Sequence, residues 1–96
     1  MSIDLKIYEQ SISYVGENSR MRKQFEEIAC VWNSELIEKI QEKGQKNWYV
    51  SSECGAEFEL LGDEVLEFAD QIKKYDKDFK DNAIDINEWY RCEVSY

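Results

Sequence analysis

The sequence predicts an α+β domain built on a four-stranded antiparallel sheet with two helices on one face. Three observations favour this class: apolar residues alternate with polar ones near both ends of the chain, two internal segments carry apolar residues at helical spacing, and a short hairpin separates those segments. The resulting order of strand, helix, strand, strand, helix, strand is that of the ferredoxin-like βαββαβ arrangement. At 96 residues, we expect the whole chain, 1–96, to form a single domain.

The first strand is expected near the N-terminus, where Ile3, Leu5 and Ile7 alternate with Asp, Lys and Tyr. Residues 19–43 then place apolar side chains, among them Phe25, Ile28 and Trp32, at helical spacing, which predicts a helix with these residues in its buried stripe. Asn33 could also cap a second helix, so one long helix and two helices joined at Asn33 both fit the pattern. The alternative fold is therefore another small α+β sheet with the first helix split near Asn33.

Residues 47–61 are expected to form a hairpin. A three-residue loop over 53–55, with Gly55 in the left-handed conformation, would pair Val50 with Phe58 and gather the apolar residues on one face. The side chains that then point away from the core are Tyr49, Ser51, Glu57 and Glu59.

A second helix is expected to begin at Asp63, with a buried stripe through residues 65–75. The final strand, about residues 84–96, alternates again, with Tyr90 and Cys92 on the core face. The opposite face of that strand carries Asp85, Trp89, Arg91 and Glu93.

The acidic charge of the chain is concentrated in its second half. Residues 49–96 contain 13 Asp or Glu against five Lys or Arg, a net charge of −8, whereas residues 1–48 contain eight acids and seven bases. Nucleic acids and anionic membranes are bound through Lys and Arg. We therefore expect neither of them as a direct partner, and a basic protein instead.

Catalytic and metal chemistry find little support in the residues. The chain has no histidine, which excludes a Ser–His or Cys–His pair, and its four glycines form no phosphate-binding loop. A calcium loop starting at Asp76 fails at Lys80, Asp81 and Asn87. We therefore predict a non-enzymatic protein without metal or cofactor. Three widely spaced cysteines are typical of free thiols, which predicts a cytoplasmic location.

The candidate binding site is the sheet face turned away from the helices, where acids and aromatics would lie together. A solvated sheet face rarely carries exposed Trp and Tyr together, so this combination favours a binding surface. The predicted partner-binding residues are Asp4, Tyr8, Tyr49, Glu57, Glu59, Trp89 and Glu93.

The functional hypothesis is a small acidic inhibitor that occludes a basic, nucleic-acid-handling protein such as a nuclease or effector. Glu57 and Glu59 would lie about 6.8 Å apart on a strand, near two phosphate steps of a nucleic acid strand, so they could mimic phosphates. Two kinds of inhibitor fit this hypothesis equally well. One is a phage anti-CRISPR or anti-restriction protein, and the other is a toxin immunity protein or antitoxin. The alternative is a structural or adaptor subunit that forms a homodimer through the sheet face or the last strand.

Overall fold

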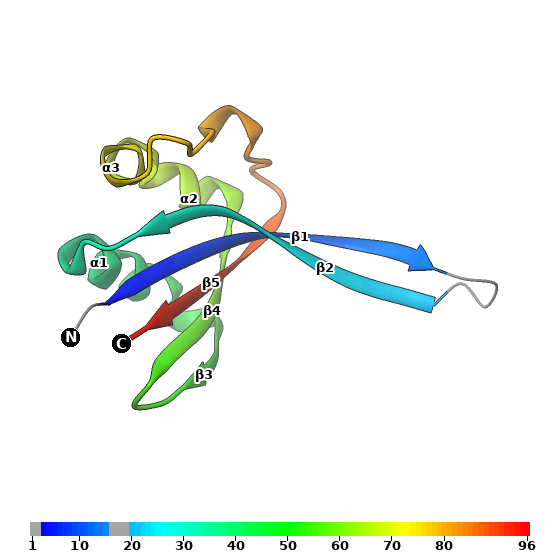
Figure 1. Cartoon of the computed structure of the whole chain (residues 1–96), viewed down its shortest axis with the longest axis horizontal. Helices are drawn as coiled ribbons and strands as arrows, with labels where there is room; N and C mark the ends of the chain where they lie inside the picture. Colours follow the sequence, from blue (N-terminus) through cyan, green and yellow to red (C-terminus); the bar gives the residue numbers. More distant parts are fainter. Residues whose placement is uncertain (1–2, 16–19) are drawn as a thin grey trace.

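Within residues 3–15 and 20–96, which the computed structural model describes, the chain forms an antiparallel five-stranded sheet with α-helices on one face (Figure 1). The side chains between 12 and 23 and those of residues 49–50 lie outside this description. The α+β class and the antiparallel sheet are confirmed, but the sheet has five strands where four were predicted, and within the described residues three α-helices take the place of two. The strands are β1 (Asp4–Val15), β2 (Arg20–Val31), β3 (Trp48–Ser51), β4 (Gly55–Leu61) and β5 (Trp89–Ser95), the helices are α1 (Ser34–Gly44), α2 (Gly62–Glu67) and α3 (Ala69–Tyr75), and the 3-10 turns are η1 (Gln45–Asn47) and η2 (Asp81–Ala83).

The helix predicted to begin at residue 19 is wrong in its first part. Residues 20–31 form strand β2 instead. β2 pairs with β1 along its length, starting with Leu5 opposite Val31. The ladder satisfies the backbone polar groups of both strands, and such tertiary pairing overrides a weak helical pattern. The sequence did contain a strand signal here, since residues 28–32 are five consecutive apolar or aromatic residues.

The predicted ferredoxin-like order is also wrong, because the sheet order is β2-β1-β5-β4-β3. β2 returns directly along one edge of β1 and leaves only the other edge for β5. β5 is therefore enclosed between β1 and β4, and β2 and β3 form the edges of the sheet. Because β5 is not an edge strand, a homodimer cannot form by pairing through it.

Helix α1 begins where the split-helix alternative expected it. The Asn33 Oδ1 accepts a hydrogen bond from the Leu36 amide at 2.9 Å, which satisfies one free donor of the first turn. Leu36, Ile37 and Ile40 are buried against the sheet. The segment 19–43 thus contains a strand followed by a helix within its described part.

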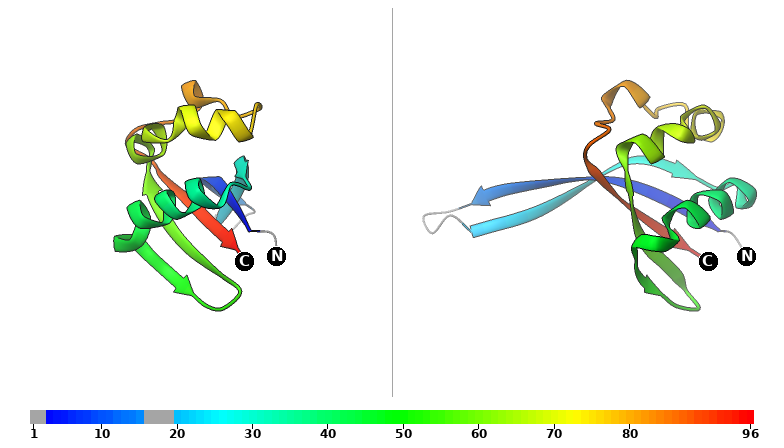
Figure 2. Two further views of the ribbon diagram at one scale, coloured as in Figure 1. Left: turned by 90° about the vertical axis from the view of Figure 1, so that its left-hand side faces the viewer. Right: turned by 180° about the vertical axis from the view of Figure 1, so that it is seen from behind.

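The hydrophobic core lies between the helices and the inner face of the sheet (Figure 2). Alternate residues of β1, β4 and β5 enter it, and the intervening residues are exposed or half-buried on the opposite face. The buried members of the core are Leu5, Ile7, Ala29, Val31, Leu36, Ile37, Ile40, Phe58, Leu60, Val65, Ala69, Ile72, Phe79, Tyr90, Cys92 and Val94.

The hairpin of β3 and β4 differs from the predicted one in its register. Its turn closes through the Ser52 amide, which donates a hydrogen bond to the Gly55 carbonyl at 2.9 Å, and Gly55 is an ordinary strand residue without a left-handed φ. Trp48 lies opposite Phe58, next to a register shift in β3. The shift leaves the alternation of β4 intact, so its acidic side chains still point away from the core.

The second helical segment is divided into α2 and α3 at Phe68. Its first turn is capped by Glu64 and not by Asp63, because the Glu64 Oε1 accepts a hydrogen bond from the Leu61 amide at 3.0 Å. Glu64 also forms an ion pair with Lys46 at 3.3 Å. In the part of the chain that the structure describes, no helix has the length and apolar character needed to cross a bilayer.

A two-stranded arm extends from the body of the molecule (Figure 1). β1 pairs with β5 only from Asp4 to Glu9, and beyond Glu9 it pairs with β2 alone. We call residues 10–15 with 20–25 the arm. Its root, at Glu9 and Glu26, lies beside the segment that follows α3, which places acidic residues of distant parts of the chain next to one another.

The cysteines differ in exposure, and we expect Cys54 to be the reactive one. Cys54 is exposed in the β3–β4 turn, whereas Cys92 is fully buried in the core. Burial raises the pKa of the Cys92 thiol, and the thiolate is the reactive form. Ellman's reagent should therefore label Cys54 rapidly and Cys92 only on unfolding. The fast reaction should disappear in Cys54→Ser, and its persistence there would contradict the assignment.

Candidate functional site

The strand registers bring the predicted site residues of β1, β4 and β5 to the same face of the sheet. Glu93 of β5 lies between Lys6 of β1 and Glu57 of β4, and the next row places Arg91 between Tyr8 and Glu59. The side chain of Tyr49 lies outside the described residues. We call this surface the outer sheet face; it contains Asp4, Lys6, Tyr8, Gln10, Phe25, Glu27, Cys30, Glu57, Glu59, Leu61, Trp89, Arg91 and Glu93.

Arg91 is the centre of the outer sheet face. Glu57 and Glu93 lie directly opposite each other on β4 and β5, an arrangement that is unfavourable for two carboxylates. Arg91 bridges them, donating to the Glu57 Oε2 at 2.5 Å and to the Glu93 Oε1 at 3.0 Å. Its guanidinium also lies over the Phe25 ring, 5.3 Å from the centroid. Two of the predicted binding acids are therefore already paired within the chain.

The local charges also act on the titratable groups of this face. Burial lowers the pKa of Arg91, but the hydrogen bonds and charges of Glu93 and Glu57 outweigh it and raise that pKa above its ordinary value. Partial burial and the negative charge of Glu93 raise the pKa of the Tyr8 phenol. Arg91 stays charged and Tyr8 stays neutral at physiological pH, so the face holds a fixed pattern of charges and donors.

Asp4 and Glu59 are the predicted site acids that remain without an ion pair among the described residues. Glu59 accepts a hydrogen bond from the Gln10 side-chain amide at 3.2 Å, which positions its carboxylate without neutralising it. Overall, five carboxylates face two bases on the outer sheet face, which leaves a net charge of −3. The negative charge available to a partner is therefore carried mainly by Asp4 and Glu59.

Exposed aromatic side chains border the same surface. Phe25 is 44% exposed and Trp89 is 42% exposed, and Tyr8, opposite Arg91 in the neighbouring row, is half-buried. Large aromatic side chains with an accessible ring are the usual anchors of protein interfaces. Phe25 was missed by the sequence interpretation because it was assigned to the buried stripe of a helix. The signal that could have found it is the apolar run of residues 28–32, which is typical of a strand; in the structure that strand, β2, includes Phe25.

We predict that Arg91→Met destabilises the fold by about 1–2 kcal/mol, because it removes two charged hydrogen bonds and leaves Glu57 opposite Glu93. The carboxylates are more than one third exposed, so solvent screening limits the loss. Urea unfolding at low salt and at 1 M salt is the measurement, and the loss should shrink at high salt. Lys43→Met, which removes one exposed ion pair with Glu67, is the matched control and should cost less. An equal loss for both variants would contradict the bridging role.

The outer sheet face has the features of a contact surface. Hydrogen bonds between side chains of neighbouring strands fix the positions of its charged groups, and exposed aromatic rings lie at its margin. No group of three or more Cys, Asp or Glu in the described part of the chain is arranged to hold a metal ion. What this arrangement can do chemically is to form ion pairs, hydrogen bonds and apolar contacts with a partner.

The comparisons with known proteins give no relative. No family model matches the chain, and no match was found among curated proteins or solved structures. The site therefore has to be interpreted from its own residues.

Proposed function

We propose that the chain is a non-enzymatic binding protein that occludes a basic, nucleic-acid-handling protein, such as a nuclease or an effector, through the outer sheet face. The observation that carries the proposal is the composition of that face, with acids in excess and the exposed aromatics Phe25 and Trp89 at its margin. The net charge of −9 supports it, because a strongly acidic protein and a basic partner associate rapidly.

Mimicry of phosphates by a Glu57–Glu59 row receives less support than the overall charge of the face. The Glu57 carboxylate is bound to Arg91, so it cannot occupy a phosphate socket of a partner without breaking that pair. We propose instead that Asp4 and Glu59 contact basic side chains of the partner and that Trp89 supplies an apolar anchor.

A homodimer through the outer sheet face is a weaker candidate, since it would bring two negatively charged surfaces together. The inhibitor could act in either of two settings, against a CRISPR or restriction effector or as an immunity protein against a nuclease toxin. Both have the same mechanism, and the partner's identity distinguishes them.

The proposal is tested by affinity capture from the native host with wild type and two charge variants. Asp4→Lys/Glu59→Lys changes the outer sheet face, and Glu38→Lys/Glu42→Lys makes the same charge change on the exposed side of α1. We expect the wild type and the α1 variant to retain one basic nucleic-acid-handling protein at low salt and to release it as salt rises. The face variant should lose it. Equal capture by both variants, or a stable dimer without a partner, would contradict the proposal.

A further inference from the structure

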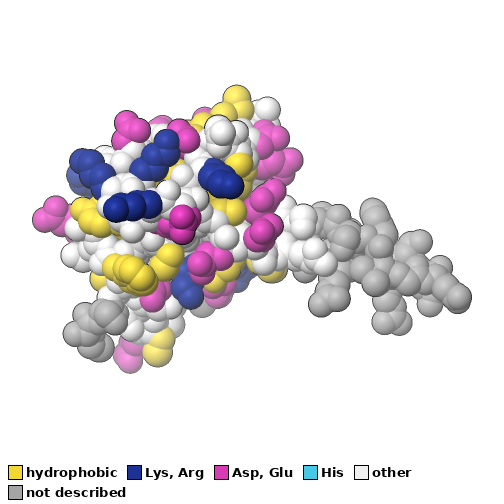
Figure 3. Space-filling model, turned by 45° about the horizontal axis from the view of Figure 1, so that its top comes forward, with side chains coloured by type: hydrophobic (Ala, Val, Ile, Leu, Met, Phe, Trp, Pro, Cys, Tyr) yellow, Lys and Arg dark blue, Asp and Glu magenta, His cyan; other side chains and the backbone are white. Residues whose placement is uncertain are grey.

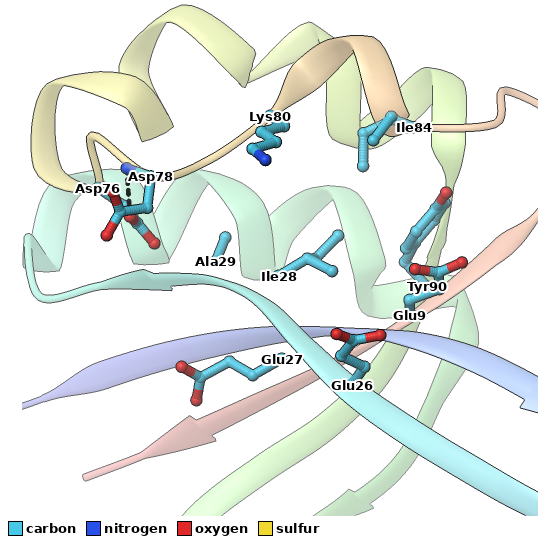
Figure 4. A pocket seen from close by; sticks show the side chains of 11 residues that line it. Glu9, Glu26, Glu27, Ile28, Ala29, Asp76, Asp78, Lys80, Ile84 and Tyr90 are labelled. Atoms are coloured by element: carbon cyan, nitrogen blue, oxygen red, sulfur yellow. Dashed lines mark hydrogen bonds between the residues drawn. The ribbon is translucent and has the colours of Figure 1, made fainter.

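A groove with an apolar floor runs beside the root of the arm, on the helix side of the sheet (Figure 4). β2 and the segment that follows α3 form its two walls, and its volume is about 380 Å³. Ile28, Ala29, Ile84 and Tyr90 line the floor. This size is at the lower end of the range for ligand pockets, and it suits a side chain better than a large molecule.

One end of the groove contains two carboxylates that oppose each other. Glu9 and Glu26 are directly paired across β1 and β2, where like charges destabilise a sheet. Both are exposed, and within the described residues neither belongs to an ion pair. Arg91 relieves the comparable repulsion on the outer sheet face, but no cation of the described chain does so here. A cation from outside would remove this repulsion.

The other end of the groove is fixed by Asp76. Its Oδ2 accepts a hydrogen bond from the Cys30 amide at 2.8 Å, and its Oδ1 accepts one from the Asp78 amide at 3.1 Å. The bond from the Cys30 amide joins the segment after α3 to the open edge of β2, so the two walls of the groove are held together. In Figure 4 the Lys80 ammonium points into the space between the two ends. Lys80 is itself exposed and forms no ion pair among the described residues, so it lines the groove without neutralising Glu9 or Glu26.

A second cavity of about 420 Å³ continues the groove towards the outer sheet face. The two cavities share Glu9, Ala83 and Tyr90, and the second is also lined by Asp85, Glu88 and Trp89. In Figure 3 a column of acidic side chains lies along the right-hand side of the coloured surface, and most of the basic side chains lie further to the left, among other acidic ones. The negative groove and the outer sheet face thus meet at Trp89.

We propose that this groove binds lysine or arginine side chains from an extended basic segment of the partner. The cationic head lies between Glu9 and Glu26, and the hydrocarbon stem packs on Ile28, Ile84 and Tyr90. Charge complementarity and continuity with the outer sheet face identify this occupant. The identity of the partner rests on the proposed function, but the groove itself is tested with a defined peptide.

The experiment is an NMR titration of the ¹⁵N-labelled chain with hexa-arginine, with spermidine as a second probe. We expect hexa-arginine to shift the amides of Glu26, Ala29 and Tyr90. Glu26→Gln should weaken binding about twofold to fivefold, as for the loss of one exposed ion pair. Lys80→Gln should tighten it, because a competing positive charge is removed. Glu42→Gln is the matched control, since Glu38 and Glu42 are an exposed acidic pair four residues apart on α1, and it should leave binding unchanged.

A measurement on the free protein separates binding from structural support. Glu26→Gln should raise the unfolding midpoint, because it relieves the repulsion with Glu9; a lower midpoint would show that Glu26 supports the fold and would overturn the proposal. The proposal is also overturned if hexa-arginine shifts only the amides of Glu59 and Arg91, if it shifts none, or if spermidine binds more tightly. None of these results affects the outcome of the capture experiment, so the groove and the proposed function can fail separately.

Discussion

Phe58→Ala is expected to destabilise the protein by about 3–5 kcal/mol, which is a large part of the stability of a small domain. Phe58 is fully buried on the inner face of β4, and its ring stacks on Trp48 with the ring centroids 5.9 Å apart. It also fills the space beside Gly44, where an added Cβ would overlap the ring. Urea unfolding followed by far-UV circular dichroism measures the loss.

Phe25→Ala is the matched control for Phe58, because it removes the same atoms from a half-exposed position. Its cost should be about 1 kcal/mol or less, since its ring contributes mainly a cation–π contact to Arg91. A helix over residues 19–43 with Phe25 in its buried stripe would instead make both substitutions costly. Comparable losses for the two variants would therefore contradict the observed fold.

Gly62→Ala is expected to cost about 3 kcal/mol, at the upper end of the range for overpacking. The Cα of Gly62 lies so close to the backbone oxygen of Asp85 that an added Cβ would overlap it, and a backbone atom cannot move aside as a flexible side chain does. The Gly62 amide also donates to the Glu88 carbonyl at 2.8 Å. The substitution therefore displaces the loop before β5, and with it Trp89.

Asp63→Ala, at the next position, is the control for Gly62. Asp63 is exposed and does not form the N-terminal cap, so its replacement should be nearly neutral. Urea unfolding compares the two variants, and ¹⁵N amide shifts of residues 84–89 report on the loop. Unchanged loop shifts in Gly62→Ala would contradict the close approach of the two backbones.

The alternation of inward and outward side chains along single strands could be predicted from the sequence. It is correct although the sheet order and the hairpin register differ from the prediction. Glu57, Glu59 and Glu93 face outward as predicted, because the side-chain period of a strand is two whatever its neighbours are. The register of the β3–β4 hairpin was predicted incorrectly. The register shift lies beside Trp48 in β3, so it does not change which residues of β4 face the core. The local sequence pattern was therefore enough to predict which side chains of β4 and β5 point outward.

Pairing between distant segments could not be predicted in the same way. Phe25, Ile28 and Trp32 fit helical spacing, and only the long ladder with β1 selects the strand. The groove depends on this ladder, because Glu9 and Glu26 become neighbours only when β1 and β2 pair. Arg91 was expected on the outer face, but its bridge between Glu57 and Glu93 required the positions of two neighbouring strands.

The central claim is that the outer sheet face binds a basic protein, and carboxyl footprinting of the captured complex tests it most directly. Carbodiimide labelling with mass spectrometry would compare the free and bound chain. The claim predicts protection of Asp4 and Glu59 on binding, with unchanged labelling of Glu38 and Glu42 on the exposed side of α1. Protection of Glu38 and Glu42 with full labelling of Asp4 and Glu59 would contradict it.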